Sequence, residues 1–171
     1  MYQSVSPNVN FVEQEKKIEA FWEEEHIFEK SIDSRKKGTP YVFYDGPPTA
    51  NGKPHIGHVL TRVIKDMIPR YRTMKGYMVP RKAGWDTHGL PVELEVEKKL
   101  GLDGKDQIEK YGLEPFIAHC KESVWKYKGM WEDFSRTVGF WADMEHPYVT
   151  DDYDYIESEW WALKSIYDRG L

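Results

Sequence analysis

The segment from residue 44 to residue 58 constrains the fold of this chain most strongly. It reads "YDGPPTANGKPHIGH" and holds three prolines and three glycines. Proline and glycine interrupt regular structure, so the segment predicts a turn. The run "YVFYDG" at its beginning is rich in aromatic residues and predicts a short buried strand.

After this turn, apolar residues recur three or four positions apart, a spacing that predicts a helix beginning near Gly57 with one buried stripe. The stripe comprises Val59, Leu60, Val63, Ile64, Met67, Ile68 and Tyr71. Pro69 is expected to bend this helix or to end it nearby. The run "YMVPRKAGWDTHGLP" then predicts a second short strand leading into a loop. Strand, turn, helix and strand form a βαβ unit with parallel strands, so the predicted fold class is α/β.

The remaining segments are predicted to be mainly helical. Residues 9–31 have apolar positions at helical spacing among Glu and Lys, which predicts one amphipathic helix on the outside of the domain. Further helices are expected over "VELEVEKKLG", along the apolar stripe from Phe116 to Phe134, and along a stripe that includes Trp160 and Tyr167. Only two strands are recognisable, so we expect the sheet to be completed by other strands.

Charge and cysteine content exclude several classes of protein. The formal net charge of -5 argues against a generic nucleic-acid coat or a membrane-surface protein. Residues 53–82 nevertheless hold eight basic residues and one acidic residue, which fits either a solvated helix face or a phosphate-facing patch. Cys120 is the single cysteine, and no Cys and His cluster has zinc spacing, so no metal site is predicted. Without a leader or a long apolar run, the sequence predicts a cytoplasmic protein with no membrane segment.

Two histidines stand where the predicted helix begins. A helix N-terminus offers unpaired N–H groups to an anion, and a glycine lets a ligand approach closely. His55 and His58 are three residues apart, so both imidazoles can face the same volume and donate to phosphate oxygens. The alternative is that one histidine caps the helix and the other packs. The usual phosphate-loop patterns are absent, so the residues alone indicate a candidate nucleotide site at the end of a parallel strand.

The sequence "HIGH", residues 55–58, is the signature of class I aminoacyl-tRNA synthetases. Together with "GPPTANGKPHIGH", "KDMIPRYRTMKGY" and "GWDTHGLPVELEVEKKLG", it makes nearly the whole chain similar to the isoleucyl-tRNA synthetase family. The resemblance implies the first half of a Rossmann-like nucleotide-binding fold, with parallel strands and crossover helices. Residues 1–38 would form an N-terminal helical extension. Residues 39–171 would form the N-terminal half of the catalytic domain, truncated before the editing insertion.

The resemblance also implies roles for individual residues on the nucleotide side. His55 and His58 would be catalytic, because they would contact the ATP phosphates and stabilise charge as the isoleucine carboxylate attacks. Gly57 would leave room for adenine and ribose at the helix start. Asn51 and Gly52 would shape the approach of the nucleotide.

On the amino-acid side, the resemblance implies that Gly46 and Pro47 line the aminoacyl-adenylate pocket. Asp86 would pair with the α-ammonium group of isoleucine. From the residues alone, Asp86 could instead cap the helix that follows Pro91. Trp85 and His88, which flank Asp86, are expected to have structural roles.

The implied substrates are isoleucine, ATP with Mg²⁺, and tRNA(Ile), and the full-length enzyme is expected to be a monomer. The Lys-Met-Ser-Lys-Ser loop, the editing insertion and the zinc-binding cysteines of the family are not in this sequence, so any zinc is expected elsewhere. The isolated chain is therefore expected to have negligible aminoacylation activity. Two alternatives remain: a nucleotidyltransferase with an HxGH motif that adds AMP to a small phosphate ester, and a noncatalytic fragment that binds ATP or adenylate.

Overall fold

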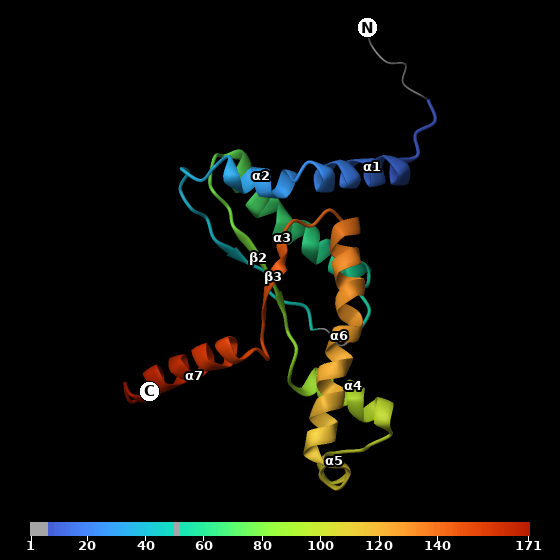
Figure 1. The fold of residues 1–171 in the computed structure, drawn as a ribbon, viewed down its shortest axis with the longest axis vertical. Helices are drawn as coiled ribbons and strands as arrows, with labels where there is room; N and C mark the ends of the chain where they lie inside the picture. Colours follow the sequence, from blue (N-terminus) through green and yellow to red (C-terminus); the bar gives the residue numbers. More distant parts are fainter. Residues whose placement is uncertain (1–6, 50–51) are drawn as a thin grey trace.

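A computed structural model describes residues 7–49 and 52–171 of the chain (Figure 1). Its helices and strands follow in the order α1 (Phe11–Glu24), α2 (Ile27–Asp33), β1 (Phe43–Tyr44), α3 (Ile56–Met74), β2 (Arg81–Trp85), α4 (Leu90–Leu100), α5 (Lys105–Tyr111), α6 (Leu113–Thr137), β3 (Asp143–Val149) and α7 (Tyr153–Tyr167).

In the described residues the strands form a three-stranded parallel sheet in the order β1-β2-β3. An isolated bridge between Thr49 and Asp86 continues the pairing of β1 with β2 beyond the ends of both strands. The arrangement confirms the predicted α/β fold with parallel strands and crossover helices. The count of two strands is wrong, because β3 was expected to lie in a helical region. Pro147 and the charged residues within β3 hide its β pattern, since proline is rare inside strands.

The first strand is also less buried than its sequence suggests. β1 has two residues and lies at an edge of the described sheet, and the Tyr44 side chain is 61% exposed. The prediction of a buried strand is therefore wrong for β1. The buried residue here is Asp45, which directly follows the strand.

Helix α3 begins at Ile56, next to the predicted start. It buries the face opposite to the apolar stripe that the sequence predicts to be buried. Its apolar stripe is largely exposed, with Leu60 at 64% and Met67 at 59%. The buried residues of α3 are instead Arg62, Asp66, Pro69 and Thr73. The charged members of this buried face have partners of opposite charge, which offsets the cost of removing them from water. Pro69 does not end the helix, which continues to Met74.

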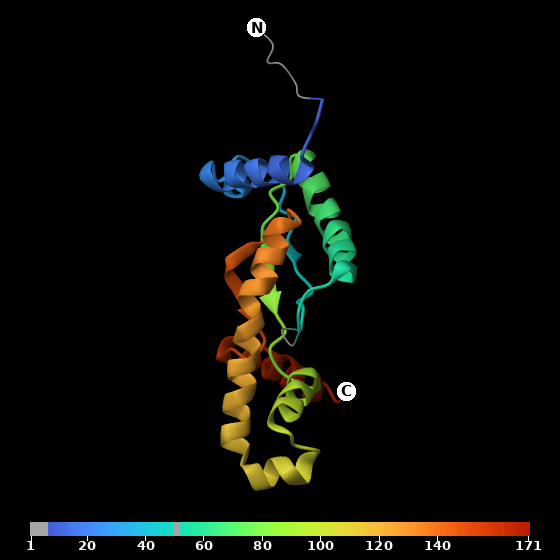
Figure 2. The same cartoon turned by 90° about the vertical axis from the view of Figure 1, so that its right-hand side faces the viewer.

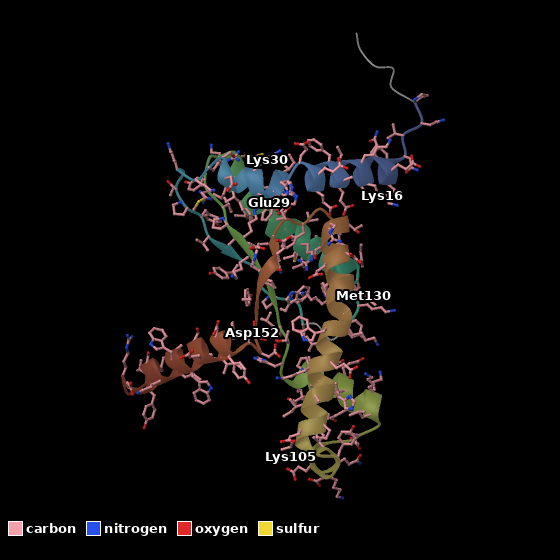
Figure 3. All side chains as sticks on the ribbon, viewed as in Figure 1. Lys16, Glu29, Lys30, Lys105, Met130 and Asp152 are labelled. Carbon is pink, nitrogen blue, oxygen red and sulfur yellow. The ribbon has the colours of Figure 1, made fainter. Side chains whose placement is uncertain are left out.

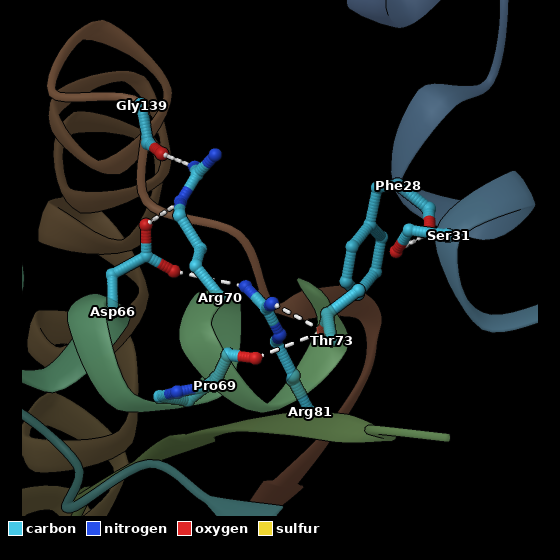
Figure 4. A network of polar contacts seen from close by, with 8 residues as sticks. All are labelled: Phe28, Ser31, Asp66, Pro69, Arg70, Thr73, Arg81 and Gly139. Carbon is cyan, nitrogen blue, oxygen red and sulfur yellow. Dashed lines mark hydrogen bonds and ion pairs between the residues drawn. The ribbon is translucent and has the colours of Figure 1, made fainter. Parts of the chain in front are cut away.

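One buried network ties α3 to β2 and to the segment after α6 (Figure 4). The Asp66 carboxylate accepts hydrogen bonds from Arg70 and, at 2.9 Å, from Nη1 of Arg81. Arg81 also donates to Thr73 Oγ1 at 3.1 Å, and Arg70 donates to the Gly139 carbonyl. Burial lowers the pKa of Arg81 to about 10, although Asp66 counteracts this effect. Part of the basic patch seen in the sequence is therefore structural.

The core lies where α6 packs against α4 and the ends of β2 and β3. Its largest cluster comprises Trp85, Val92, Val124, Trp131 and Val149. A second cluster of Val96, Ile108 and Phe116 joins α4, α5 and α6. Figures 1 and 2 show that α4 and α5 lie at the end of the molecule opposite α1 and α2.

The outer helices contribute little to this core. The single helix predicted over residues 9–31 is divided into α1 and α2 at His26, whose φ is +49°. Trp22 of α1 packs edge-on against Trp141 at 5.0 Å between ring centroids. Helix α7 leaves the sheet at Asp152, and its side chains project from the rest of the chain (Figure 3). Trp160 is accordingly 67% exposed. Among the described residues, no helix is both long and apolar enough to cross a membrane.

Candidate functional site

A cavity of about 510 Å³ lies between the turn after β1, the first half of α3 and the middle of α6. Its lining residues are Gly46, Pro47, Pro48, Thr49, Gly52, Lys53, His55, His58, Thr61, Arg62, Lys65 and Trp131. The cavity therefore stands at the carboxyl end of a parallel strand, where open α/β sheets bind ligands.

The two predicted histidines form a reciprocal capping box at the start of α3. His55 is the N-cap, and its Nδ1 accepts a hydrogen bond from the Gly57 N–H at 3.1 Å. His58 Nδ1 accepts in return from the His55 N–H at 3.0 Å. The alternative that one histidine caps the helix is thus correct for His55, but capping leaves both rings at the cavity, with centroids 3.8 Å apart.

These hydrogen bonds assign the protonation of both rings. An imidazole nitrogen that accepts an N–H cannot carry a proton, so each neutral ring holds its proton on Nε2. Burial lowers the pKa of His58 below its usual 6.5, and the neighbouring charges of His55, Arg62 and Lys65 lower it further. His58 is therefore a neutral hydrogen-bond donor near neutral pH.

Glycine at position 57 suits the capping box itself. A Cβ there would lie 3.0 Å from His55 Cε1 and 3.1 Å from His55 Nδ1, so the His55 ring would have to shift by a few tenths of an ångström. Gly57 is exposed but is not among the cavity-lining residues. The structure thus supplies a reason for this glycine within the chain, in addition to the expected approach of a nucleotide.

The buried carboxylate of Asp45 connects the turn after β1 to α3. Lys65 Nζ lies 2.6 Å from Asp45 Oδ1 and donates to the Gly46 carbonyl at 2.8 Å. Arg62 Nη1 lies 3.5 Å from Asp45 Oδ2. Burial lowers the pKa of Arg62, and the Asp45 carboxylate opposes that shift. Asp45 thereby links the Gly46 backbone to two cationic side chains at the cavity.

Tyr148 of β3 holds the same turn from the side of the sheet. Its hydroxyl donates to the Asp45 carbonyl, and its ring stacks on Tyr155 at 6.0 Å between centroids. Burial raises the pKa of Tyr148 to about 12, with smaller effects from Asp45, Tyr155 and Asp86. The ring passes over Gly84, where an added Cβ would lie 2.2 Å from Tyr148 Cζ.

Asp86 lies beside this turn, directly after β2. Its backbone N–H donates to the Pro48 carbonyl at 3.2 Å, and its Oδ2 accepts from Thr49 Oγ1 at 3.2 Å. The alternative role as a helix cap is wrong, because α4 begins after Gly89 and no described side chain caps it. Asp86 does not line the cavity, but its partner Thr49 does.

The structure therefore brings together most of the predicted site. Gly46, Pro47, Gly52, His55 and His58 line one cavity, and Asp86 adjoins it through Thr49. The predicted nucleotide contact Asn51 lies outside the described residues. No group of three or more His, Cys, Asp or Glu side chains in the described ranges could hold a metal ion.

Seven lining residues are not among the predicted site residues: Pro48, Thr49, Lys53, Thr61, Arg62, Lys65 and Trp131. Arg62 and Lys65 follow His58 by four and seven residues, and helical spacing places such positions on the same face. That spacing could have identified them. For Trp131 the sequence carries no local signal, since the residue is distant in the chain.

Comparisons with known proteins identify the family of this chain. The family model described as tRNA synthetases class I (I, L, M and V) matches residues 17–171. The isoleucine–tRNA ligase of Clostridium kluyveri is 64% identical over the whole chain, and that of Thermus thermophilus is 56% identical over 95% of it. The chain spans about 16% of the length of these relatives.

A solved structure shows the same fold. In the ternary complex of Agrobacterium radiobacter LeuRS with tRNA and LeuAMS, the similar part covers 92% of this chain and 18% of that one, with a TM-score of 0.63 and 22% identity. The family match over nine-tenths of the residues and the identities to curated relatives lead to one conclusion. This chain belongs to the class I tRNA synthetases of the isoleucine, leucine, methionine and valine group.

Proposed function

We propose that this chain supplies the ATP- and isoleucine-binding part of an isoleucine–tRNA ligase. The full-length enzyme would condense isoleucine with ATP to isoleucyl-adenylate, release pyrophosphate and transfer the acyl group to tRNA(Ile). The observation that carries the proposal is the cavity shared by the histidine capping box and the Gly46–Pro47 turn, with Asp86 beside it. The identity to isoleucine–tRNA ligases supports isoleucine as the amino acid.

On the nucleotide side, His55 and His58 would act as hydrogen-bond donors. Their Nδ1 atoms are occupied by backbone N–H groups, so their Nε2–H groups are available for phosphate oxygens. Lys53 and Arg62 add positive charge to the same cavity. ATP would bring Mg²⁺ with it, and the protein's contribution is prearranged electrostatic stabilisation of the charge that develops at the α-phosphate.

The neighbouring residues would complete the nucleotide site. Gly57 would admit the adenine and ribose at the start of α3. Asn51 and Gly52 would shape the loop over which the nucleotide enters. Gly52 lines the cavity, which supports this role.

On the amino-acid side, Gly46 and Pro47 would form the wall that contacts the isoleucine side chain and the adenylate. Asp86 would pair with the α-ammonium group, which orients the carboxylate of isoleucine toward the α-phosphate. The hydroxyl of Thr49 donates to Asp86 Oδ2, and the carboxylate has further lone pairs that would accept from the ammonium group of the substrate.

We further propose the domain organisation implied by the resemblance. Residues 1–38 form a helical extension, and residues 39–171 form the N-terminal half of the Rossmann-like catalytic domain. The full-length protein would act as a cytoplasmic monomer. Any zinc would be bound by other parts of that protein.

The test uses a chimera in which these 171 residues replace the matching segment of the Clostridium kluyveri relative. ATP–pyrophosphate exchange is measured with isoleucine, leucine, valine or methionine. We expect exchange that prefers isoleucine. Preference for another amino acid would refute isoleucine as the substrate. No exchange would refute the proposed function and leave a noncatalytic ATP- or adenylate-binding role.

Asp86→Asn tests the amino-acid side in the same chimera. A charge-assisted hydrogen bond is worth about 1.5–3 kcal/mol, so kcat/KM for isoleucine should fall by about 10- to 150-fold. Asp106→Asn in α5 is the matched control, because Asp106 is exposed and lies in the first turn of α5. Equal activity of Asp86→Asn and Asp106→Asn would show that Asp86 does not bind the α-ammonium group. The alternative of a nucleotidyltransferase for a phosphate ester assigns no ligand to Asp86, and the family match argues against it.

A further inference from the structure

Trp131 of α6 reaches the cavity from a distant part of the chain. Its indole Nε1–H donates to the Gly52 carbonyl at 2.9 Å, a contact between residues 79 positions apart. The side chain is almost completely buried, with 3% of the residue exposed. A partly buried hydrogen bond from a ring that is itself packed in the core gives the Gly52 backbone a defined position.

The same ring also contacts His58. The two ring centroids are 4.6 Å apart, and the planes meet at 67°, an edge-to-face arrangement. His58 is otherwise faced by His55, whose backbone N–H donates to its Nδ1, and by Arg62 and Lys65. Trp131 thus supplies an apolar wall that limits how the imidazole can rotate.

We propose that Trp131 is a positioning residue for the nucleotide side of the site, holding the Gly52 backbone with its N–H and the His58 ring through an edge-to-face contact. This inference rests on the proposed function, because Gly52 and His58, the residues that Trp131 holds, are proposed to contact ATP. It predicts that loss of the indole N–H affects ATP and leaves isoleucine unaffected, since the Gly46–Pro47 turn has separate supports in Lys65 and Tyr148.

A core role alone would not require the indole nitrogen. Trp85 belongs to the same buried cluster and is 2% exposed. Its Nε1–H has no hydrogen-bond partner among the described residues, so its contribution there is that of an apolar ring. The two tryptophans therefore form a matched pair that differs in the contact with Gly52.

The experiment compares Trp131→Phe with Trp85→Phe in the chimera, by ATP–pyrophosphate exchange and thermal unfolding. Both changes remove part of a buried ring, so both should lower the melting temperature by similar amounts. Loss of one neutral hydrogen bond changes a binding constant by about three- to tenfold. Trp131→Phe should therefore raise KM for ATP by that factor. KM for isoleucine should stay within about twofold of the unsubstituted chimera. Trp85→Phe should change neither KM.

A second variant isolates the N–H group if Trp131→Phe does not fold. Benzothienylalanine at position 131 replaces the N–H with sulfur and keeps the shape of the ring. It should reproduce the rise in KM for ATP with little change in melting temperature. An unchanged KM for ATP, or equal rises for ATP and isoleucine, would overturn the inference. If the unsubstituted chimera lacks isoleucine-dependent exchange, the proposed function itself fails, which is a distinct result.

Discussion

Lys65→Met tests whether the contacts of Lys65 with Asp45 and Gly46 shape the amino-acid side of the site. Lys65 Nζ bonds both Asp45 Oδ1, at 2.6 Å, and the Gly46 carbonyl, at 2.8 Å. Methionine keeps a similar length and removes both hydrogen bonds. Asp45 retains Arg62 as a partner at 3.5 Å, so the buried carboxylate is not left without a counter-charge.

The expected magnitude follows from these contacts. A hydrogen bond to a charged group contributes about 1.5–3 kcal/mol, and the Lys65 side chain is 26% exposed, so we expect a loss near the lower end of that range. If half or more of this loss appears as misplacement of the Gly46–Pro47 turn, KM for isoleucine rises about three- to tenfold. KM for ATP should change by less than about twofold.

ATP–pyrophosphate exchange by the chimera measures both constants. Lys75→Met is the matched control, because Lys75 is an exposed basic residue at the other end of α3. A rise in KM for ATP with unchanged KM for isoleucine would show that Lys65 binds phosphate, and the reasoning from Asp45 and Gly46 would be refuted.

Two further predictions concern His58 and Gly84. Because the folded protein holds the pKa of His58 below 6.5, the unfolded chain binds this proton more readily, so stability should decrease as the pH falls from about 6.5 through the lowered pKa. NMR titration should place the midpoint of His58 below 6.5, and a midpoint above 6.5 would contradict the capping geometry. Gly84→Ala places a Cβ 2.2 Å from Tyr148 Cζ and should destabilise the protein by about 1–3 kcal/mol, measured by denaturant unfolding. Tyr148→Ala should remove that clash, so a double variant as unstable as the sum of the single variants would argue against it.

Local patterns along the chain determined the βαβ unit, the turn and the position of the histidines. The "HIGH" residues directly precede and begin α3, and the apolar stripe from Phe116 to Phe134 lies in α6, as the sequence predicts. Such features depend on residues within a few positions of one another, because helix periodicity and turn chemistry are short-range properties. The similarity to class I synthetases is carried by the same contiguous motifs.

Tertiary structure decided which faces and which distant residues make the site. The apolar stripe of α3 predicted burial, yet α3 buries Arg62 and Asp66, because partners of opposite charge from the β1 turn and β2 meet them there. The contact of Trp131 with Gly52 joins residues 79 positions apart, and β3 pairs with β2 despite Pro147. These outcomes depend on which segments meet when the chain packs, and no periodicity within a single segment contains that information.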